Sequence, residues 1–244
     1  MKRLLAGCAL LAASLVAAAA DLSIMPVAVQ LDRAHDRTTV QVTNNGTEPV
    51  VLQAEAIAWK REAGVDRDEA SDGLLVNPGV FTLEPGKTQV VRVGLRRSQA
   101  IAEETTYRMV LREVPPLVSA DRGGVNGNVR VLIALRVPVY VAPMAVRRDE
   151  RWTARYDSDG QLVAQVSNQG NVHYKVGTLR VQGDTTQATV VAQGPESVLF
   201  PGEVRNFRLP ARASTAETRT ARAVTLEVMT DRGVQHVALD LPSR

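Results

Sequence analysis

The side chains able to do acid–base or metal chemistry are few in this chain and are not grouped. The histidines are His35, His173 and His236. They are far apart, whereas a zinc site or a catalytic dyad needs several groups at a defined spacing. The sequence also has no phosphate loop, dinucleotide-binding glycine pattern or nucleophile elbow. We therefore expect no catalytic site, no metal and no cofactor, and we interpret the chain as a binding protein rather than an enzyme.

Composition excludes nucleic acid as the expected partner. Aromatic residues make up 4% of the chain, too few for a series of base-stacking platforms. The formal net charge is +3, and removal of Lys2 and Arg3 with an N-terminal signal would lower it to +1. Such a small surplus does not indicate an electrostatic footprint for a phosphate backbone.

The N-terminus has the form of a secretory signal. A basic start, MKR, is followed by an apolar stretch from Leu4 to Ala20 with small residues at Ala18 and Ala20. We predict cleavage after Ala20 and export of the remaining chain, with no stable membrane insertion. The cysteine Cys8 falls inside the signal, so residues 21–244 contain none. The exported chain must then be held together by its apolar core alone.

The segment 128–143, NVRVLIALRVPVYVAP, alternates strictly. Aliphatic residues occupy every second position: Val129, Val131, Ile133, Leu135, Val137, Val139 and Val141. This period predicts a long strand with one apolar face. Pro138 favours an edge or a break, because proline cannot donate to a β-ladder. Two interpretations stay open: a core strand that crosses between two sheets, or an edge strand that pairs with another chain.

Short alternating segments separated by turns predict an all-β fold. A weak internal repeat supports two tandem sandwiches. Thr43-Asn44-Asn45-Gly46 returns as Ser167-Asn168-Gln169-Gly170, and Pro85-Gly86 returns as Pro201-Gly202. We predict domains at 21–143 and 144–244 after the signal at 1–20. A hairpin is expected from 223–229 and 234–241, and a solvated loop in the charged stretch 60–73, which contains Asp66, Asp68 and Glu69.

Several segments together resemble a known family. They are VTNNGTEPV, VNPGVFTLEPGKTQVVRVGL, TYRMVLREVPP and NVRVLIALRVPVYVAP. This order is similar to that of the periplasmic chaperones of the chaperone–usher pilus pathway, and the NNGTEP turn suggests the archaic or alternative branches. The resemblance covers 21–244 and is strongest at 74–143. It implies two immunoglobulin-like domains set as a boomerang, pilus or fimbrial subunits as partners, and delivery to an outer-membrane usher.

The resemblance also implies how a subunit is held. Such chaperones lend a strand to fill the apolar groove of an incomplete subunit, which is β-strand addition. The matching strand here is 128–137, with Val129, Val131, Ile133 and Leu135 as plugs and Val137 as a fifth candidate. Four buried aliphatic side chains contribute roughly 1.5–3 kcal/mol each, part of which offsets the cost of association.

The residues that hold the subunit's terminal carboxylate in this family are an Arg and a Lys. This sequence departs from that pattern, since Val27 or Ala28 and Pro138 fall near those places. Arg92, Arg96 and Arg136 are the candidate substitutes, because a guanidinium can bind a carboxylate in a bidentate fork. For Arg92 we favour a structural role.

Four alternatives to the leading hypothesis stay open. A carbohydrate-binding or adhesive sandwich would need exposed aromatics, for which the candidates are Trp59, Trp152 and Tyr156. An exported hydrolase would depend on His173 or His236. A chaperone relative serving a non-pilus surface structure differs from the leading hypothesis only in its partner. A free apolar strand also makes a self-capping homodimer an open alternative.

Overall fold

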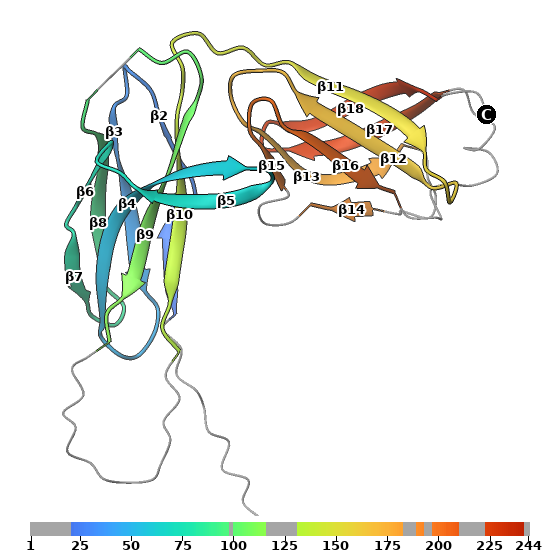
Figure 1. Ribbon diagram of the computed structural model, residues 1–244. Coiled ribbons are helices and arrows are strands. Elements are labelled where there is room, and N and C mark those ends of the chain that lie inside the picture. Colours follow the sequence, from blue (N-terminus) through green and yellow to red (C-terminus); the bar gives the residue numbers. More distant parts are fainter. Residues whose placement is uncertain are drawn as a thin grey trace, which may run out of the picture.

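The alternating segments of the sequence fold into two β-sandwiches in a computed structural model, which describes residues 21–97, 100–115, 131–182, 189–192, 197–209 and 223–241. Figure 1 shows the two sandwiches meeting at one end, so that the molecule is bent and encloses a concave side. The described residues form strands and no α-helix. The predicted all-β fold class, two immunoglobulin-like sandwiches in a boomerang, is confirmed.

Sandwich 1 consists of two sheets. Its strands are β1 (Leu22–Met25), β2 (Val29–Leu31), β3 (Arg37–Asn44), β4 (Val50–Glu62), β5 (Val65–Ala70), β6 (Leu74–Asn77), β7 (Val80–Leu83), β8 (Thr88–Leu95), β9 (Thr105–Glu113) and β10 (Ala134–Val141). One sheet has the order β1-β3-β8-β6, and the other has the order β2-β10-β9-β4-β5 with β7 also on β4. Inward-facing residues such as Val40, Val42, Val91 and Val93 fill the core between them, as the period of two requires.

Sandwich 2 follows after a linker at 142–149. Its strands are β11 (Glu150–Tyr156), β12 (Leu162–Asn168), β13 (Tyr174–Val181), β14 (Thr189–Val191), β15 (Val198–Leu199), β16 (Val204–Arg208), β17 (Ala223–Thr230) and β18 (Gly233–Asp240). The sheets have the orders β11-β12-β16 and β14-β13-β17-β18, with β15 also on β13. The expected hairpin around 231–233 is present as β17 and β18.

The internal repeat corresponds to the same buried turn in both sandwiches. The Asn44 amide donates to the carbonyls of Glu48 and Leu83, and its oxygen accepts from the Gly46 N–H. The Asn168 amide makes the matching bonds to Val172, Leu199 and Gly170. In each case the glycine of the later Pro-Gly turn, Gly86 or Gly202, donates its N–H to the asparagine carbonyl.

The charged stretch 60–73 is not the loop that we predicted. Most of it is a hairpin of β4 and β5, whose turn residues Ala63 and Gly64 have φ of 50° and 80°. Charged residues on both faces hid the strand period, and cross-strand ion pairs such as Lys60–Glu69 hold the hairpin instead of apolar contacts. In Figure 1 this hairpin extends from sandwich 1 toward β15 of sandwich 2.

Candidate functional site

Strand β10 has a free edge along half of its length. It pairs with β9 from Ala134 to Val141, but with β2 only from Val139 to Val141. On that second side, residues 134–138 have no strand partner in the described part of the chain. The Glu113 N–H bonds the Ile133 carbonyl, whereas the Ala142 N–H bonds the Leu31 carbonyl of β2. Odd-numbered backbone groups therefore face β9, and even-numbered groups at 134 and 136 face the free edge.

Pro138 fits this arrangement. It is even-numbered, so its backbone nitrogen, which carries no hydrogen, faces the edge where β2 begins and not the β9 ladder. The long, strictly alternating strand expected from the sequence is shorter in the structure. β10 begins at Ala134, residues 131–133 precede it without strand assignment, and residues 128–130 lie outside the described residues.

The odd-numbered side chains divide into two groups. Val137 is only 3% exposed and lies in the core of sandwich 1 with Val139 and Val141. Leu135 packs partly against that core, whereas Val131 is 61% exposed. Ile133 is half-buried, and Val129 lies outside the described residues. Val137 thus has almost no surface left for a partner, so we no longer place it among the plugs.

An exposed apolar side chain of another segment lies beside the free edge. Val27 comes two residues before Val29, which pairs with Val139 of β10, and its side chain is 76% exposed. Val27 therefore lies where β10 loses its neighbour. Met25, which is 70% exposed, ends β1 in the other sheet.

The opposite edge of the same sheet is protected. Strand β5 pairs with β4 and is the last strand in the order. Its sequence, VDRDEA, places charges on both faces of the hairpin. Charged edge strands resist pairing with another chain. Of the two ends of this sheet, the β10 edge is therefore the one suited to accept a strand.

Arg136 is the one candidate anchor that the fold brings to this edge. It lies on β10 itself, its side chain is 46% exposed, and its Nε is 3.4 Å from Asp68 Oδ2. Arg108 of β9 lies beside it and contacts Asp68 and Asp66 at 2.5 Å each. Because Asp68 is shared, the Arg136 guanidinium keeps room for a second carboxylate.

The other two candidates lie in a different sheet. Arg92 is exposed on β8, and within the described ranges its side chain makes no hydrogen bond or ion pair. Arg96 follows β8, and its Nε donates to the Asp72 carbonyl at 2.8 Å. The structure therefore does not bring Arg92 or Arg96 together with Arg136.

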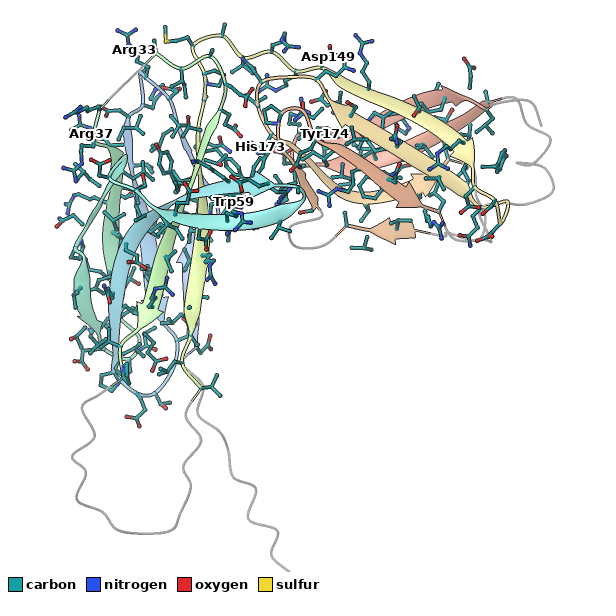
Figure 2. All side chains as sticks on the ribbon, viewed as in Figure 1. Arg33, Arg37, Trp59, Asp149, His173 and Tyr174 are labelled. Atoms are coloured by element: carbon teal, nitrogen blue, oxygen red, sulfur yellow. The ribbon has the colours of Figure 1, made fainter. Side chains whose placement is uncertain are left out.

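The junction between the sandwiches contains residues that sequence reasoning did not connect. Trp59, Tyr140 and Val198 form a small buried cluster against which Phe200 packs. Figure 2 shows Trp59 and His173 at this junction. Trp59 is an interior residue here, covered by Arg108 at 4.1 Å from its ring, and is not an exposed sugar-binding aromatic.

Arg61 is the buried cation of this junction. Its side chain is 1% exposed, and it contacts Asp66 and Glu203 at 2.8 and 2.9 Å. It also donates to the Val198 carbonyl. Burial opposes the ionisation of Asp66, but hydrogen bonds from Arg61 and Arg108 outweigh it and hold the pKa of that carboxyl below its usual range. The charges thus stay paired between β5 of sandwich 1 and Glu203 of sandwich 2.

Comparison with known proteins identifies the family. Residues 21–147 match the family described as pili and flagellar-assembly chaperone, PapD N-terminal domain. This chain belongs to that family. A chaperone protein of Bordetella pertussis, FimB/FhaD, is 26% identical over 144 residues, which cover 56% of this chain and 57% of the relative. The match therefore spans little more than half of the length of that relative.

Solved chaperone structures share the fold of the whole chain. A chain of the CsuC–CsuE chaperone–tip adhesin complex from archaic Csu pili of Acinetobacter baumannii is similar with a TM-score of 0.60 and 13% identity, covering 91% of this chain and 100% of that one. The Salmonella enterica complex of SafA pilin with the SafB chaperone gives 0.62 and 17%, with coverages of 90% and 96%. The E. coli chaperone DraB gives 0.60 and 17%, with 91% and 97%.

No helix among the described segments is long and apolar enough to cross a membrane. Within those segments, no three His, Cys, Asp or Glu side chains are grouped closely enough to hold a metal ion.

Proposed function

We propose that this protein is a periplasmic chaperone that caps pilus or fimbrial subunits by lending them its β10 edge, and that it delivers them to an outer-membrane usher. The observation that carries the proposal is the free edge of residues 134–138, continued by the exposed Val131 and bordered by the exposed Val27. Family membership supports a chaperone role, and two of the solved relatives are complexes of a chaperone with a subunit.

Strand addition fits the chemistry of this edge. An incoming strand can bond the backbone groups of Ala134 and Arg136, which gives affinity that does not depend on sequence. The plugs we assign are Val129, Val131, Ile133 and Leu135, which would enter the groove of the subunit and set its register. Each buried aliphatic plug contributes roughly 1.5–3 kcal/mol, from which the cost of ordering and association is subtracted.

Arg136 is our proposed anchor for the terminal carboxylate of the subunit. Its pair with Asp68 is partly exposed and therefore weakly held, so a bidentate carboxylate can join or replace it. Arg92 is less suited because it lies on β8 of the other sheet, and Arg96 because it lies near Val141, at the end of β10 that is already paired with β2. The chaperone role needs no catalytic group and no cofactor, and nothing in it calls for nucleic acid or a membrane segment.

The proposal also covers where the protein works and what it does when no subunit is bound. Export through a signal cleaved after Ala20 would bring residues 21–244 to the periplasm, in agreement with the description of the similar chaperone SfaE as periplasmic. Without a subunit, the free edges of two copies can pair, which gives a self-capping homodimer. The domain boundaries 21–143 and 144–244 are retained with this proposal.

The test is recovery of a subunit by a tagged protein from periplasmic extract, with mass spectrometry of the bound material. Wild type should retain a small stoichiometric partner with an alternating apolar N-terminal extension. Ile133→Asp should lose it, because a charge on a plug cannot be buried unpaired. Ala134→Asp is the matched control, since it adds the same charge one residue away on the opposite face.

Two outcomes would overturn the strand assignment. One is equal recovery of the partner by Ile133→Asp and wild type, with both folded by circular dichroism. The other is a wild type that carries no subunit when the neighbouring pilus proteins are produced. Ile133→Asp combined with Leu135→Asp extends the test, but Leu135 packs partly against the core, so the single variant comes first.

A further inference from the structure

A buried histidine of sandwich 2 is held by a carboxylate of sandwich 1. His173 lies between β12 and β13, and its Nδ1 is 2.8 and 2.9 Å from the two oxygens of Glu104. The His173 backbone N–H also donates to Glu104 at 3.1 Å. The two side chains are 9% and 3% exposed. This contact therefore joins the sandwiches away from solvent, where an interaction between charges is weakly screened.

The same imidazole lies against the strand that carries the free edge. Its ring stacks on Tyr140 of β10, with centroids 3.8 Å apart and planes 16° from parallel. Tyr140 is four residues from Arg136 on the same strand. Burial, with Glu104 and Asp231 adding to it, raises the pKa of Tyr140, so this phenol remains neutral at ordinary pH.

The charges around the histidine come from several elements. Its Nε2 is 3.8 Å from Asp231 in the β17–β18 turn. Arg232, next in that turn, lies 4.0 Å from Asp231 but bonds Glu150 at 2.6 Å. On the far side of Tyr140, Arg61 and Arg108 have carboxylate partners of their own. The groups closest to His173 are thus two carboxylates and a neutral aromatic face.

Protonation of His173 changes which hydrogen bonds its imidazole can donate. A neutral imidazole has one N–H, which serves Glu104 and leaves a lone pair facing Asp231. An imidazolium presents N–H groups to both carboxylates and places a cation on the face of Tyr140. Among side chains, histidine is the one whose charge most readily changes near neutral pH.

We propose that His173 is a positioning residue whose protonation tightens the contact between sandwich 2 and β10, so that acidification fixes the angle between the two sandwiches. The inference rests on the proposed function, because a fixed angle matters when the chaperone holds a subunit. It assigns the histidine a regulatory role beyond filling the junction.

The experiment measures how rigidly the two sandwiches are held relative to each other in the free protein. Residues 21–244 lack cysteine, so spin labels can be placed at Thr82→Cys on β7 and Ala238→Cys on β18, both exposed. Distance distributions between the two spin labels are then recorded by double electron–electron resonance between about pH 8 and about pH 5. The wild-type distribution should narrow as the pH falls. His173→Gln, which can bond Glu104 but cannot take up a proton, should keep one width throughout.

Asp231→Asn separates this role from simple packing. It should reduce the narrowing of the distribution while leaving the neutral contact with Glu104 in place. The proposal is overturned if wild type and His173→Gln show the same pH response, or if wild type shows none. Since no subunit is present, such a result would leave the strand-lending proposal intact. Conversely, if the Ile133→Asp test failed, the spin-label measurement of the contact at His173 would still stand.

Discussion

Two buried asparagines that are far apart in the sequence make matching hydrogen bonds in the two sandwiches. Asn44 and Asn168 each donate their side-chain amide to two backbone carbonyls beside the same turn of their sandwich. A buried carbonyl without a donor costs about 1–3 kcal/mol. The repeat visible in the sequence therefore reflects the same set of hydrogen bonds in both sandwiches, which explains why the asparagine and glycine recur while the surrounding residues differ.

Replacing Asn44 by Ala should lower the free energy of unfolding by about 2–3 kcal/mol, because the Glu48 and Leu83 carbonyls lose their donor. Urea denaturation measures this change. The matched control is Asn45→Ala, since Asn45 is exposed and bonds Asp21 through its backbone N–H, which alanine keeps. Equal destabilisation by both substitutions would show that the buried amide has no special role.

The β4–β5 hairpin shows how an element can escape a period-based prediction. Its two strands carry charges on both faces, because one face meets solvent and the other meets the charged junction. Neither face is an apolar stripe, so the segment looks like a solvated loop. A backbone ladder from Ile57 to Glu62 forms the hairpin, and cross-strand ion pairs such as Lys60–Glu69 and Arg61–Asp66 stabilise it.

The turn of this hairpin is not optimal. Ala63 has a φ of 50° and Gly64 a φ of 80°, the two positive values of a type I′ turn. An L-residue with a Cβ is strained there, and asparagine tolerates this region better. Ala63→Asn should raise the free energy of unfolding by about 0.5–1 kcal/mol, as measured by thermal denaturation.

Gly64→Ala is the companion variant for that turn. It adds a Cβ at a positive φ and should destabilise the protein by a similar amount. A result in which both substitutions shift the midpoint in the same direction would contradict the assigned turn.

For the elements that alternate, sequence was enough. A strand within 128–143, observed at 134–141, the β17–β18 hairpin and the two-sandwich architecture followed from periods and turn residues. The candidate site was only partly accessible. Which face of β10 is already filled, as with Val137, depends on the register against β9. Whether Arg136 meets Asp68 depends on the course of β5, which the sequence did not reveal.

At the scale of the whole molecule, hydrogen bonds at the linker add to the contacts of the junction. The Asn171 amide donates to the carbonyls of Ala102 and Ala145. The Cβ of any residue replacing Gly170 would lie 2.6 Å from the Arg147 carbonyl, so the close approach of the linker requires glycine. The placement of the two sandwiches therefore depends on the linker as well as on the junction.

Arg61 offers the sharpest test of how far this junction couples the sandwiches. Arg61→Met keeps much of the side-chain volume but leaves Glu203 with the Phe200 N–H at 3.0 Å and the more distant Arg205 at 3.8 Å. It also removes the Arg61 donor from the Val198 carbonyl. Removing one partner of a buried pair is costly. Because the carboxylates are partly exposed, we expect a loss of about 2–3 kcal/mol, confined to the contact between the sandwiches.

The two tryptophans make this loss measurable, since Trp59 lies at the junction and Trp152 packs against the core of sandwich 2. Wild type should unfold in urea with coincident signals from both, assigned with Trp59→Phe and Trp152→Phe. In Arg61→Met the Trp59 transition should move to lower urea more than that of Trp152, because the sandwiches no longer unfold together. Lys60→Met, which removes only an exposed pair with Glu69, should leave both transitions in place. Coincident, unshifted transitions in Arg61→Met would mean that the apolar cluster around Trp59 holds the junction without the buried cation.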